Sequence, residues 1–393
     1  MNILLFPYNA YSPTEGGIAR ITYTLINEFR AQGHFVLKVG HKKNEHSVVE
    51  DNYQFFLPSR ITILCQANIR FFCDLCDKYD IDIVFLQNDI LNLVELIEEV
   101  KKRKQVKAIS CIHNSVLTPV YNFAYTREYE LKKRGMAYLF RLLKTSIVKN
   151  FLVYSYIRKY RKQYRDVVNH SDAVVVLCEG QVQELKRMYG KTTLDNVYVI
   201  PNCIDSIYEP QVKKRKDVLW VGAFDTSIKR PDLMLQIWQK LLNVYPEWHL
   251  YMLGDGYAFD EMKRLSENMQ MERITFTGRV NPSEYYSMAK ILCVTSTHEA
   301  FPMVTLEAMC YGLATVAFNS FTSAPVLIED KQTGFLVTPF KVDEYAETLS
   351  AIMRNDQLQS LLSEASRRKA EEFSITVVYK KWENLFNKLV NKD

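Results

Sequence analysis

Two glutamates, Glu299 and Glu307, stand eight positions apart around the predicted start of a helix. An apolar strand is expected to end near Thr295, and Pro302 suits the first helical position, where its missing N–H group costs nothing. The backbone amides of residues 303–305 would then point out of the helix N-terminus, and such amides bind anions. This pattern predicts an anion site that fits a diphosphate.

The two glutamates need a different partner, because a carboxylate does not ligate a phosphate. We expect each of them to accept hydrogen bonds from hydroxyl groups, one on either side of the bound diphosphate. A nucleotide-sugar carries hydroxyls on both sides, on its ribose and on its sugar. The alternative is a pair of surface acids at a helix start, where negative charge is favourable in any protein.

Four glycine-containing motifs accompany the two glutamates. They are Gly16-Gly17 after the first predicted strand, Val221-Gly222 followed by Lys229, Leu253-Gly254-Asp255-Gly256, and Phe276-Thr277-Gly278. In its motifs and their order the chain resembles the family-four retaining glycosyltransferases of the GT-B fold, of the type that acts in bacterial polysaccharide biosynthesis. The resemblance covers nearly the whole chain and depends most on Glu299 and Glu307, which match the family's two glutamates with seven residues between them.

The resemblance implies a role for each matching residue. Glu299 would contact hydroxyls of the donor sugar, Glu307 would contact the ribose, and Lys229 would neutralise charge that grows on the diphosphate. Gly17 would let the backbone approach the phosphates, because it has no Cβ. His113, at the end of a strand expected over 108–113, would lie beside the transferred sugar. The expected catalytic residues are therefore Glu299, His113 and Lys229, and the expected donor-binding residues are Gly16, Gly17, Lys229, Arg230, Val280, Phe301, Met303, Val304 and Glu307.

One position departs from the family pattern. Ala223 stands where an arginine commonly shares the phosphate with the lysine. Either Lys229 acts alone, or Arg230 or another cation takes the place of that arginine. The departure also supports an alternative function, a catalytically degenerate nucleotide-binding scaffold in a membrane-associated polysaccharide assembly complex. A sugar phosphorylase of related fold is a further alternative, although the sequence lacks an evident lysine motif for pyridoxal phosphate.

The main hypothesis is an enzyme that moves a hexose-type sugar from a nucleoside diphosphate sugar, with a UDP-sugar favoured, to a glycan acceptor. A basic aromatic segment over residues 127–165 suggests an acceptor linked to polyprenyl diphosphate, as in bacterial capsule or O-antigen assembly. No metal or other cofactor is expected, because the helix dipole and Lys229 would fill the role of a divalent ion. We interpret the Asp-x-Asp sequence at 80–82 as polar residues that cap a strand, with a metal-bound diphosphate as the alternative.

Apolar segments alternate with helical patterns along the chain, and this alternation predicts parallel sheets covered by helices. Strands are expected over 3–8, 35–39, 83–87, 108–113, 173–178, 197–200, 218–224, 249–253, 274–277, 291–295, 314–318 and 334–337. The predicted fold class is α/β, with two doubly wound Rossmann-like domains facing across a cleft. The expected boundaries are 1–203 for an acceptor-side domain, 204–373 for a nucleotide-sugar domain, and 374–393 for a helix that packs back toward the N-terminal domain.

A basic aromatic segment covers residues 127–165. It carries twelve Lys or Arg against only Glu128 and Glu130, although the net charge of the whole chain is +5. Such a helical segment can bind an anionic membrane surface. It can equally pack its apolar side on the sheet and leave a solvated basic face. Nucleic acid is not an expected partner, because no recognised nucleic-acid module accompanies the segment.

The composition agrees with an ordinary globular protein. The 393 residues are 48% hydrophobic and 24% charged, which excludes disordered, collagen-like and disulfide-rich classes. No run of 18 uncharged apolar residues occurs, and the first residues lack the basic leader of a signal peptide. We therefore expect a cytoplasmic protein with reduced cysteines, peripheral on the inner face of the cell membrane if the basic segment binds lipid.

Overall fold

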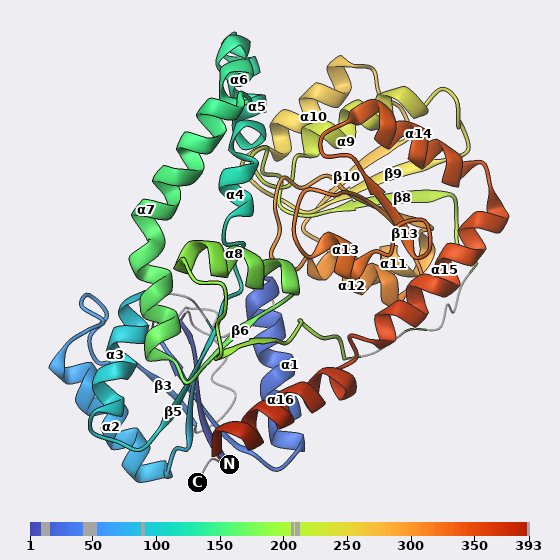
Figure 1. The fold of residues 1–393 in the computed structure, drawn as a ribbon. Helices are drawn as coiled ribbons and strands as arrows, with labels where there is room; N and C mark the ends of the chain where they lie inside the picture. The colour runs from blue at the N-terminus through green and yellow to red at the C-terminus, as the bar shows by residue number, and fades with distance from the viewer. Residues whose placement is uncertain (9–15, 42–52, 88–90, 206–207, 209–212, 391–393) are drawn as a thin grey trace. The chain divides into compact units, whose positions relative to one another are not determined.

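The computed structural model describes residues 1–8, 16–41, 53–87, 91–205, 208 and 213–390. The chain forms two compact units, each built on one parallel sheet (Figure 1). Unit 1 comprises Met1–Val116, Ile157–Asp205 and Ile375–Asp393, and unit 2 comprises Leu117–Tyr156 and Ser206–Ser374. This architecture confirms the predicted class of two doubly wound α/β domains.

The sheet of unit 1 has seven parallel strands in the order β3-β2-β1-β4-β5-β6-β7. They are β1 (Asn2–Tyr8), β2 (Phe35–Gly40), β3 (Gln54–Phe56), β4 (Ile83–Leu86), β5 (Lys107–Cys111), β6 (Ala173–Val176) and β7 (Val197–Val199). The central strands are apolar and buried, as they must be when helices cover both faces of a parallel sheet. The strand order reverses between β1 and β4, and α/β proteins bind ligands outside the carboxyl ends of strands at such a switch point.

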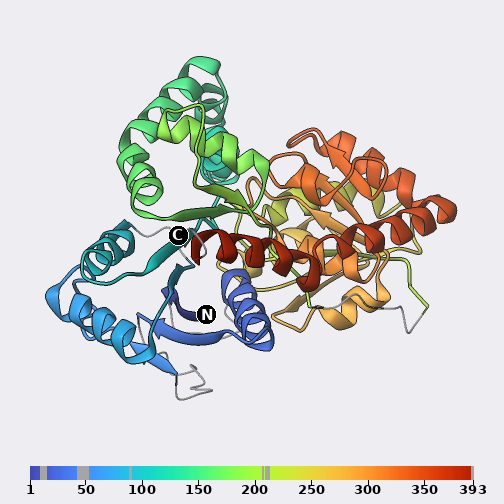
Figure 2. The same ribbon diagram turned by 60° about the horizontal axis from the view of Figure 1, so that its bottom comes forward.

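Helices from both ends of the chain complete unit 1. They are α1 (Gly17–Ala31), α2 (Gln66–Tyr79), α3 (Leu91–Lys101), α8 (Glu179–Tyr189) and α16 (Ile375–Val390), together with the second part of α7 (Ser146–His170). The C-terminal α16 lies beside α1 (Figure 2). The ring of Phe29 on α1 has its centroid 5.2 Å from that of Phe386 and 6.1 Å from that of Trp382. These aromatic contacts explain why the end of the chain returns to the unit that contains its beginning.

The sheet of unit 2 has six parallel strands in the order β10-β9-β8-β11-β12-β13. They are β8 (Asp217–Val221), β9 (His249–Leu253), β10 (Ile274–Gly278), β11 (Ile291–Val294), β12 (Ala314–Phe318) and β13 (Gly334–Val337). Here the order reverses between β8 and β11, which makes the carboxyl ends of these two strands the switch point of unit 2.

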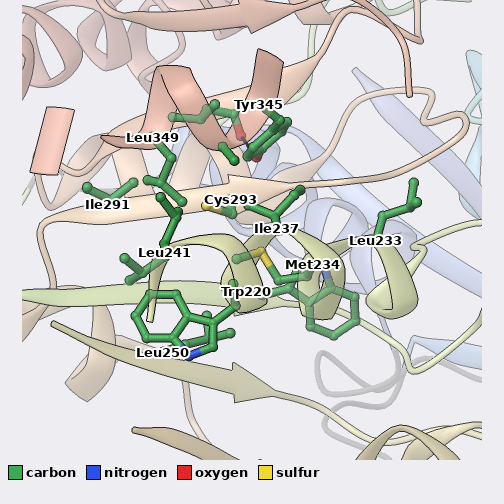
Figure 3. Close-up of a cluster of buried hydrophobic side chains, with 14 of the residues drawn as sticks. Trp220, Leu233, Met234, Ile237, Leu241, Leu250, Ile291, Cys293, Tyr345 and Leu349 are labelled. Atoms are coloured by element: carbon green, nitrogen blue, oxygen red, sulfur yellow. Dashed lines mark hydrogen bonds between the residues drawn. The ribbon is translucent and has the colours of Figure 1, made fainter. Parts of the chain in front are cut away.

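Helices cover this sheet, on which unit 2 has a large apolar core. They are α9 (Pro231–Leu241), α10 (Phe259–Asn268), α11 (Ser283–Met288), α12 (Met303–Cys310), α13 (Ala324–Leu327), α14 (Val342–Met353) and α15 (Asp356–Glu371). Trp220 of β8, Ile237 of α9 and Tyr345 of α14 meet in this core (Figure 3). The hydroxyl of Tyr345 also accepts the backbone N–H of Val294 at 3.1 Å, so α14 is tied to β11 by both packing and a hydrogen bond.

Three further helices of unit 2 come from the middle of the chain. They are α4 (Thr118–Tyr121), α5 (Phe123–Lys133) and α6 (Ala137–Leu143). From the sequence, these residues were expected in the acceptor-side domain, 1–203. In the structure, residues 117–156 belong to unit 2. Asn122 donates to the carbonyls of Thr297 (2.6 Å) and Ser320 (2.8 Å), and Tyr129 donates to Glu261 (2.8 Å). These polar contacts join residues that are far apart in the sequence, so the hydrophobic periodicity of the sequence did not indicate them.

The loops that leave β8 and β9 pack against each other without room for side chains. Gly254 has a φ of +128°, and a Cβ built on it would lie 2.0 Å from the carbonyl oxygen of Gly222. Gly256 also has too little room for a side chain, since its Cβ would lie 2.8 Å from backbone atoms of Phe224. The glycines of this motif therefore allow two neighbouring loops to touch at the edge of the sheet where β8 ends.

We predict that Gly254→Ala destabilises the protein much more than Gly278→Ala. Gly278 also has a positive φ, +68°, but a Cβ there meets nothing within 4 Å. The Gly278 substitution should thus cost only the backbone strain, about 1–2 kcal/mol, while the Gly254 substitution adds a backbone clash. Urea unfolding followed by circular dichroism measures both. Equal losses in the free energy of unfolding for the two variants would contradict the close contact between the loops.

Candidate functional site

Lys229 and Glu299 meet at the switch point of unit 2. Lys229 lies in the loop after β8, Glu299 lies in the loop after β11, and Nζ of the lysine is 2.5 Å from Oε1 of the glutamate. Both side chains are mostly buried, with 24% and 13% exposure. The structure thus brings together two of the residues that the sequence analysis selected, although 70 positions separate them.

The loop before α9 holds Lys229 in place. The carboxylate of Asp225 accepts hydrogen bonds from the backbone N–H groups of Ser227 (2.6 Å) and Ile228 (3.1 Å), which closes a turn directly before the lysine. The aliphatic part of the Lys229 side chain lies over Gly222. A Cβ built on Gly222 would be 3.4 Å from Cδ of Lys229. The hydroxyl of Thr295 donates to the Lys229 carbonyl at 2.8 Å, so the loop is also tied to the end of β11.

The loop after β11 holds Glu299 in turn. Ser296 donates its hydroxyl to Oε1 of Glu299 at 2.7 Å, and the Thr297 N–H donates to the Ile228 carbonyl at 2.7 Å. The neighbouring His298 has its Nδ1 3.0 Å from the hydroxyl of Thr297. Burial lowers the pKa of His298 below its usual value. Ser296 and Lys229 therefore both donate to the same oxygen, Oε1, of the Glu299 carboxylate and fix its position.

The helix start that follows differs slightly from the prediction. Pro302 is the N-cap residue with an extended backbone, and α12 begins at Met303. The amide of Thr305 donates to the Pro302 carbonyl at 3.1 Å and so is not free for a ligand. Met303 and Val304, at the first two helical positions, have amides without a partner inside the helix. On the second turn, Glu307 accepts a hydrogen bond from the hydroxyl of Tyr286 at 3.2 Å.

Arg230 does not join this site, contrary to the suggestion that it shares a phosphate with Lys229. Its backbone is left-handed, with a φ of +56°, and its side chain is only 1% exposed. The guanidinium donates to both carboxylate oxygens of Asp232 (2.9 and 2.8 Å), to Glu128 (3.1 Å) and to the Tyr125 carbonyl (2.8 Å). The guanidinium thus joins α9 to α5, and the carboxylates of Asp232 and Glu128 compensate its charge.

Two other expected donor-binding residues have contrasting positions. The side chain of Phe301 is buried against Phe373, with ring centroids 5.7 Å apart, so the ring is a core residue and only its backbone borders the loop of Glu299. Val280, two residues after the end of β10, is 38% exposed and available to a ligand.

Of the expected residues of unit 1, Gly16 and Gly17 lie between β1 and α1, and His113 lies after β5, the neighbour of β4 in the sheet. Gly16, with a φ of +112°, precedes the first helical residue Gly17, and both are exposed. The turn before them, residues 12–15, lies outside the described residues. His113 follows β5 by two residues and is bonded through Nε2 to Oε1 of Gln87, which directly follows β4. The sequence analysis did not select Gln87. A polar residue immediately after a wholly apolar strand was the available signal.

The structure gives no site for a resident metal ion within the described ranges, where no group of three or more His, Cys, Asp or Glu side chains gathers. At the Asp-x-Asp sequence, Asp82 accepts the backbone N–H of Asn2 at 2.7 Å, and the Asp80 carbonyl accepts the Asn2 side chain. This agrees with the interpretation that these residues cap a strand. All eight cysteines are free, and seven of them are buried.

Two family models match consecutive parts of the chain. The model described as Glycosyltransferase Family 4 matches residues 15–206, and the model described as Glycosyl transferases group 1 matches residues 206–369. Two solved structures match over nearly the full chain. They are a lipopolysaccharide outer core galactosyltransferase, WaaB (TM-score 0.69, 17% identity, 99% of this chain and 100% of that one), and the Anabaena protein HepE in complex with UDP (TM-score 0.73, 17% identity, 99% and 100%).

Curated relatives are similar over about half of the chain. An uncharacterized glycosyltransferase of Haemophilus influenzae is 31% identical over 56% of this chain and 62% of its own length. The amylovoran biosynthesis glycosyltransferase AmsD of Erwinia amylovora is 27% identical over 55% and 62%. A Campylobacter jejuni N-acetylgalactosaminyltransferase, whose name gives a diphospho-undecaprenol-linked glycan as its acceptor, is 24% identical over 47% and 51%. The chain thus spans less than two thirds of each of these relatives.

We predict unequal effects on stability for the two neighbouring cations. Arg230→Ala leaves the buried carboxylate of Asp232 without its cation and removes one of the two cations that pair with Glu128, so it should lower the free energy of unfolding by about 3–5 kcal/mol. Lys229→Ala removes a partly exposed ion pair and should change it by less than about 1 kcal/mol. Denaturant unfolding of both variants checks this. An Arg230→Ala protein as stable as the wild type would contradict the structural role of the arginine.

Proposed function

Because the chain belongs to the family-four glycosyltransferases of the GT-B fold, we propose that it transfers a hexose-type sugar from a nucleoside diphosphate sugar to an acceptor, with retention of anomeric configuration. The observation that carries the proposal is the Lys229–Glu299 pair at the switch point of unit 2. A cation and a carboxylate held together beside a helix start suit a ligand that joins a diphosphate to a sugar.

Charge compensation explains how the pair would act. In the free protein, Glu299 neutralises Lys229. A diphosphate is a stronger counter-charge for Nζ, so its binding would release the Glu299 oxygen to accept a hydroxyl of the sugar. The amides of Met303 and Val304 would face the phosphate, and Glu307 would accept a ribose hydroxyl. Tyr286, now bonded to Glu307, would keep that carboxylate oriented.

The chemical step is a substitution at the anomeric carbon. The bond from that carbon to the diphosphate oxygen breaks, and a bond to an acceptor hydroxyl oxygen forms on the same face of the sugar. The acceptor proton passes to the departing phosphate, so no enzymatic base is required. Lys229 would stabilise the negative charge that grows on the leaving group. From the family resemblance, His113 of unit 1 would contact the transferred sugar.

The donor and the acceptor are proposed from the relatives. UDP is the favoured nucleotide, because the HepE structure is a complex with UDP. A glycan linked to polyprenyl diphosphate is the favoured acceptor, because the named Campylobacter relative acts on such a substrate. The amylovoran enzyme likewise supports a role in cell-surface polysaccharide assembly, of which capsule and O-antigen are examples. We further propose that the transfer needs no metal ion or other cofactor.

The alternative is a nucleotide-binding scaffold without turnover. Ala223 favours it, and so does the burial of Arg230, since Lys229 then remains as the one cation among the residues selected in unit 2. Binding of a nucleotide-sugar without transfer to any lipid-linked or glycan acceptor would support this function instead.

We also propose that the enzyme works at the inner face of the cytoplasmic membrane, bound through residues 137–156. This helical elbow comprises α6 and the first part of α7 (Figure 1). Large apolar side chains are exposed on it. Ile147 is 83% exposed and Phe151 is 66% exposed. The exposed members of the elbow that would enter the lipid are Tyr138, Leu142, Ile147, Phe151 and Tyr154.

The charges of the basic segment favour the elbow, rather than the residues on either side of it, as the part that binds the membrane. On α5, Lys132 and Lys133 form ion pairs with Glu128 and Glu261. Beyond the elbow, Arg161 and Arg165 donate to the backbone carbonyls of Met188 and Tyr189, the last two residues of α8. Within the elbow no acidic residue occurs, and the exposed cations are Arg141, Lys144 and Lys149.

An apolar groove lies beside the elbow. It has a volume of about 340 Å³, and its lining includes the apolar Leu131, Met136, Leu139 and Leu143 and the charged Arg127, Glu130 and Arg134. Apolar side chains next to arginines suit the boundary between acyl chains and anionic headgroups, where each cation contributes about 1 kcal/mol. No helix in the described parts of the chain has the length and apolar character to cross a bilayer.

We predict that Lys229→Met and Glu299→Gln each lower the transfer rate at least about 100-fold without unfolding the protein, because each removes a group that acts on the charged leaving group or the sugar. Lys240→Met and Glu247→Gln make the same changes in exposed ion pairs and should leave the rate unchanged. A radiolabelled UDP-sugar assay with and without EDTA measures the rate. Full activity in both site variants would overturn the site, and loss with EDTA would overturn metal independence.

We predict that the double substitution Ile147→Ser and Phe151→Ser reduces binding to vesicles of phosphatidylglycerol at least about tenfold, because two exposed apolar anchors are lost. Val244→Ser with Leu361→Ser is the matched control, since those residues are 63% and 58% exposed elsewhere on unit 2. Vesicle flotation at physiological salt gives the bound fraction. Wild-type binding by the elbow variant would contradict the proposed surface.

A further inference from the structure

Among the six buried side-chain nitrogen and oxygen atoms of unit 1 that have no hydrogen-bond partner within the described part of the chain, three lie on two neighbouring loops. They are Nε2 of Gln87, directly after β4, and Nδ1 of His113 and Oγ of Ser115, after β5. Because β4 and β5 pair in parallel, both loops leave the same edge of the sheet. An unpaired buried polar group costs free energy, so native proteins rarely keep one without a purpose. Three such atoms at one edge indicate a site for a polar ligand.

The bond between Gln87 and His113 fixes the protonation of the imidazole. The amide oxygen of Gln87 is an acceptor only, so His113 Nε2 must carry the proton that it donates to Oε1. Burial lowers the pKa of His113 to about 4, and the ring therefore holds a single proton near neutral pH. The other nitrogen, Nδ1, is consequently an acceptor.

The backbone around His113 is held by neighbouring elements. The N–H of Ile112 donates to the Val175 carbonyl at 2.9 Å. Further along the loop, the Asn114 carbonyl accepts from Gln181 at 3.2 Å, and the N–H of Val116 donates to Glu184 at 3.1 Å. Both of these partners are buried side chains of α8. The backbone of the loop is thus fixed on both sides of His113. What is left to determine is which nitrogen of its imidazole carries the proton.

We propose that Gln87 is a positioning residue, which holds His113 in the Nε2-protonated tautomer so that Nδ1 accepts a hydrogen bond from a hydroxyl group of a sugar. The free N–H groups of Gln87 donate to a hydroxyl oxygen of the same ligand, and the Ser115 hydroxyl can do either. A polyhydroxylated ligand supplies all three partners. The identity of that ligand rests on the proposed function, whereas the tautomer is a property of the free protein.

Nitrogen NMR of the full chain, labelled with ¹⁵N in its histidines, tests the tautomer without any turnover. The signal of His113 is assigned by its loss in His113→Asn. In the wild type at pH 7 we expect one protonated nitrogen, Nε2, and an unprotonated Nδ1. In Gln87→Leu, which keeps the volume but removes the acceptor, the two tautomers should mix. An unchanged His113 signal in a folded Gln87→Leu protein overturns the proposal.

Gln87→Glu provides a second test that does not depend on the folding of the leucine variant. The carboxylate still accepts from Nε2, but its charge favours the imidazolium and raises the pKa of His113. Below that raised pKa, Nδ1 is protonated and cannot accept, so kcat should fall about tenfold or more as pH decreases and recover as pH increases. The wild type should show no such loss over the same range. Identical pH profiles for the two proteins overturn the role of Gln87 in the reaction.

The two tests separate this inference from the proposed function. If the wild type transfers no sugar, the proposed function fails, and the NMR result still decides the tautomer. If the wild type is active and the His113 signals do not respond to Gln87→Leu, the proposed function stands and the positioning role fails. Binding of UDP, measured by calorimetry, should be equal in all Gln87 variants, because the contacts proposed for Gln87 and His113 are with the sugar and not with the nucleotide.

Discussion

The geometry of the parallel sheet determines where chemistry can occur in this protein. All strands of a parallel sheet end at the same edge, and loops diverge where the strand order reverses. Unit 2 reverses between β8 and β11, and the loops from these two strands carry Lys229 and Glu299. Unit 1 reverses between β1 and β4, where Gly16 and Gln87 follow the strands. Each unit therefore offers its polar and glycine-rich loops at the one position where a ligand can reach the backbone.

The two neighbouring cations in the loop before α9 illustrate how a buried charge is separated from an available one. A left-handed backbone at Arg230 accompanies a guanidinium that is surrounded by two carboxylates and a carbonyl. Lys229 keeps partial exposure and a single acidic partner. A fully compensated buried arginine cannot leave its partners without a large desolvation cost, whereas a lysine with one partner can exchange it for a phosphate.

Much of the fold and part of the site could be predicted from the sequence. Twelve strands were expected close to their observed positions, because most are apolar runs bounded by polar or glycine residues. Strand β3 was missed because only two of its three residues are apolar, whereas the equally short β7 is apolar throughout. Lys229 and Glu299 were selected from motifs that a single strand–loop–helix unit displays locally. The burial of Arg230, the core position of Phe301 and the bond between Gln87 and His113 depend on contacts between distant segments. Residue type and spacing carry no signal for such contacts.

Unit 2 is discontinuous in the chain, and this affects how its parts can be exchanged between related proteins. A chimera joined near residue 204 would combine the sheet of one parent with the helices α4 to α6 of the other. The mixed interface would include Asn122 against Thr297, Glu128 against Arg230 and Tyr129 against Glu261. Domain recombination at this junction thus requires both parents to keep these pairs. A graft that includes residues 117–156 transfers unit 2 with its own polar contacts intact.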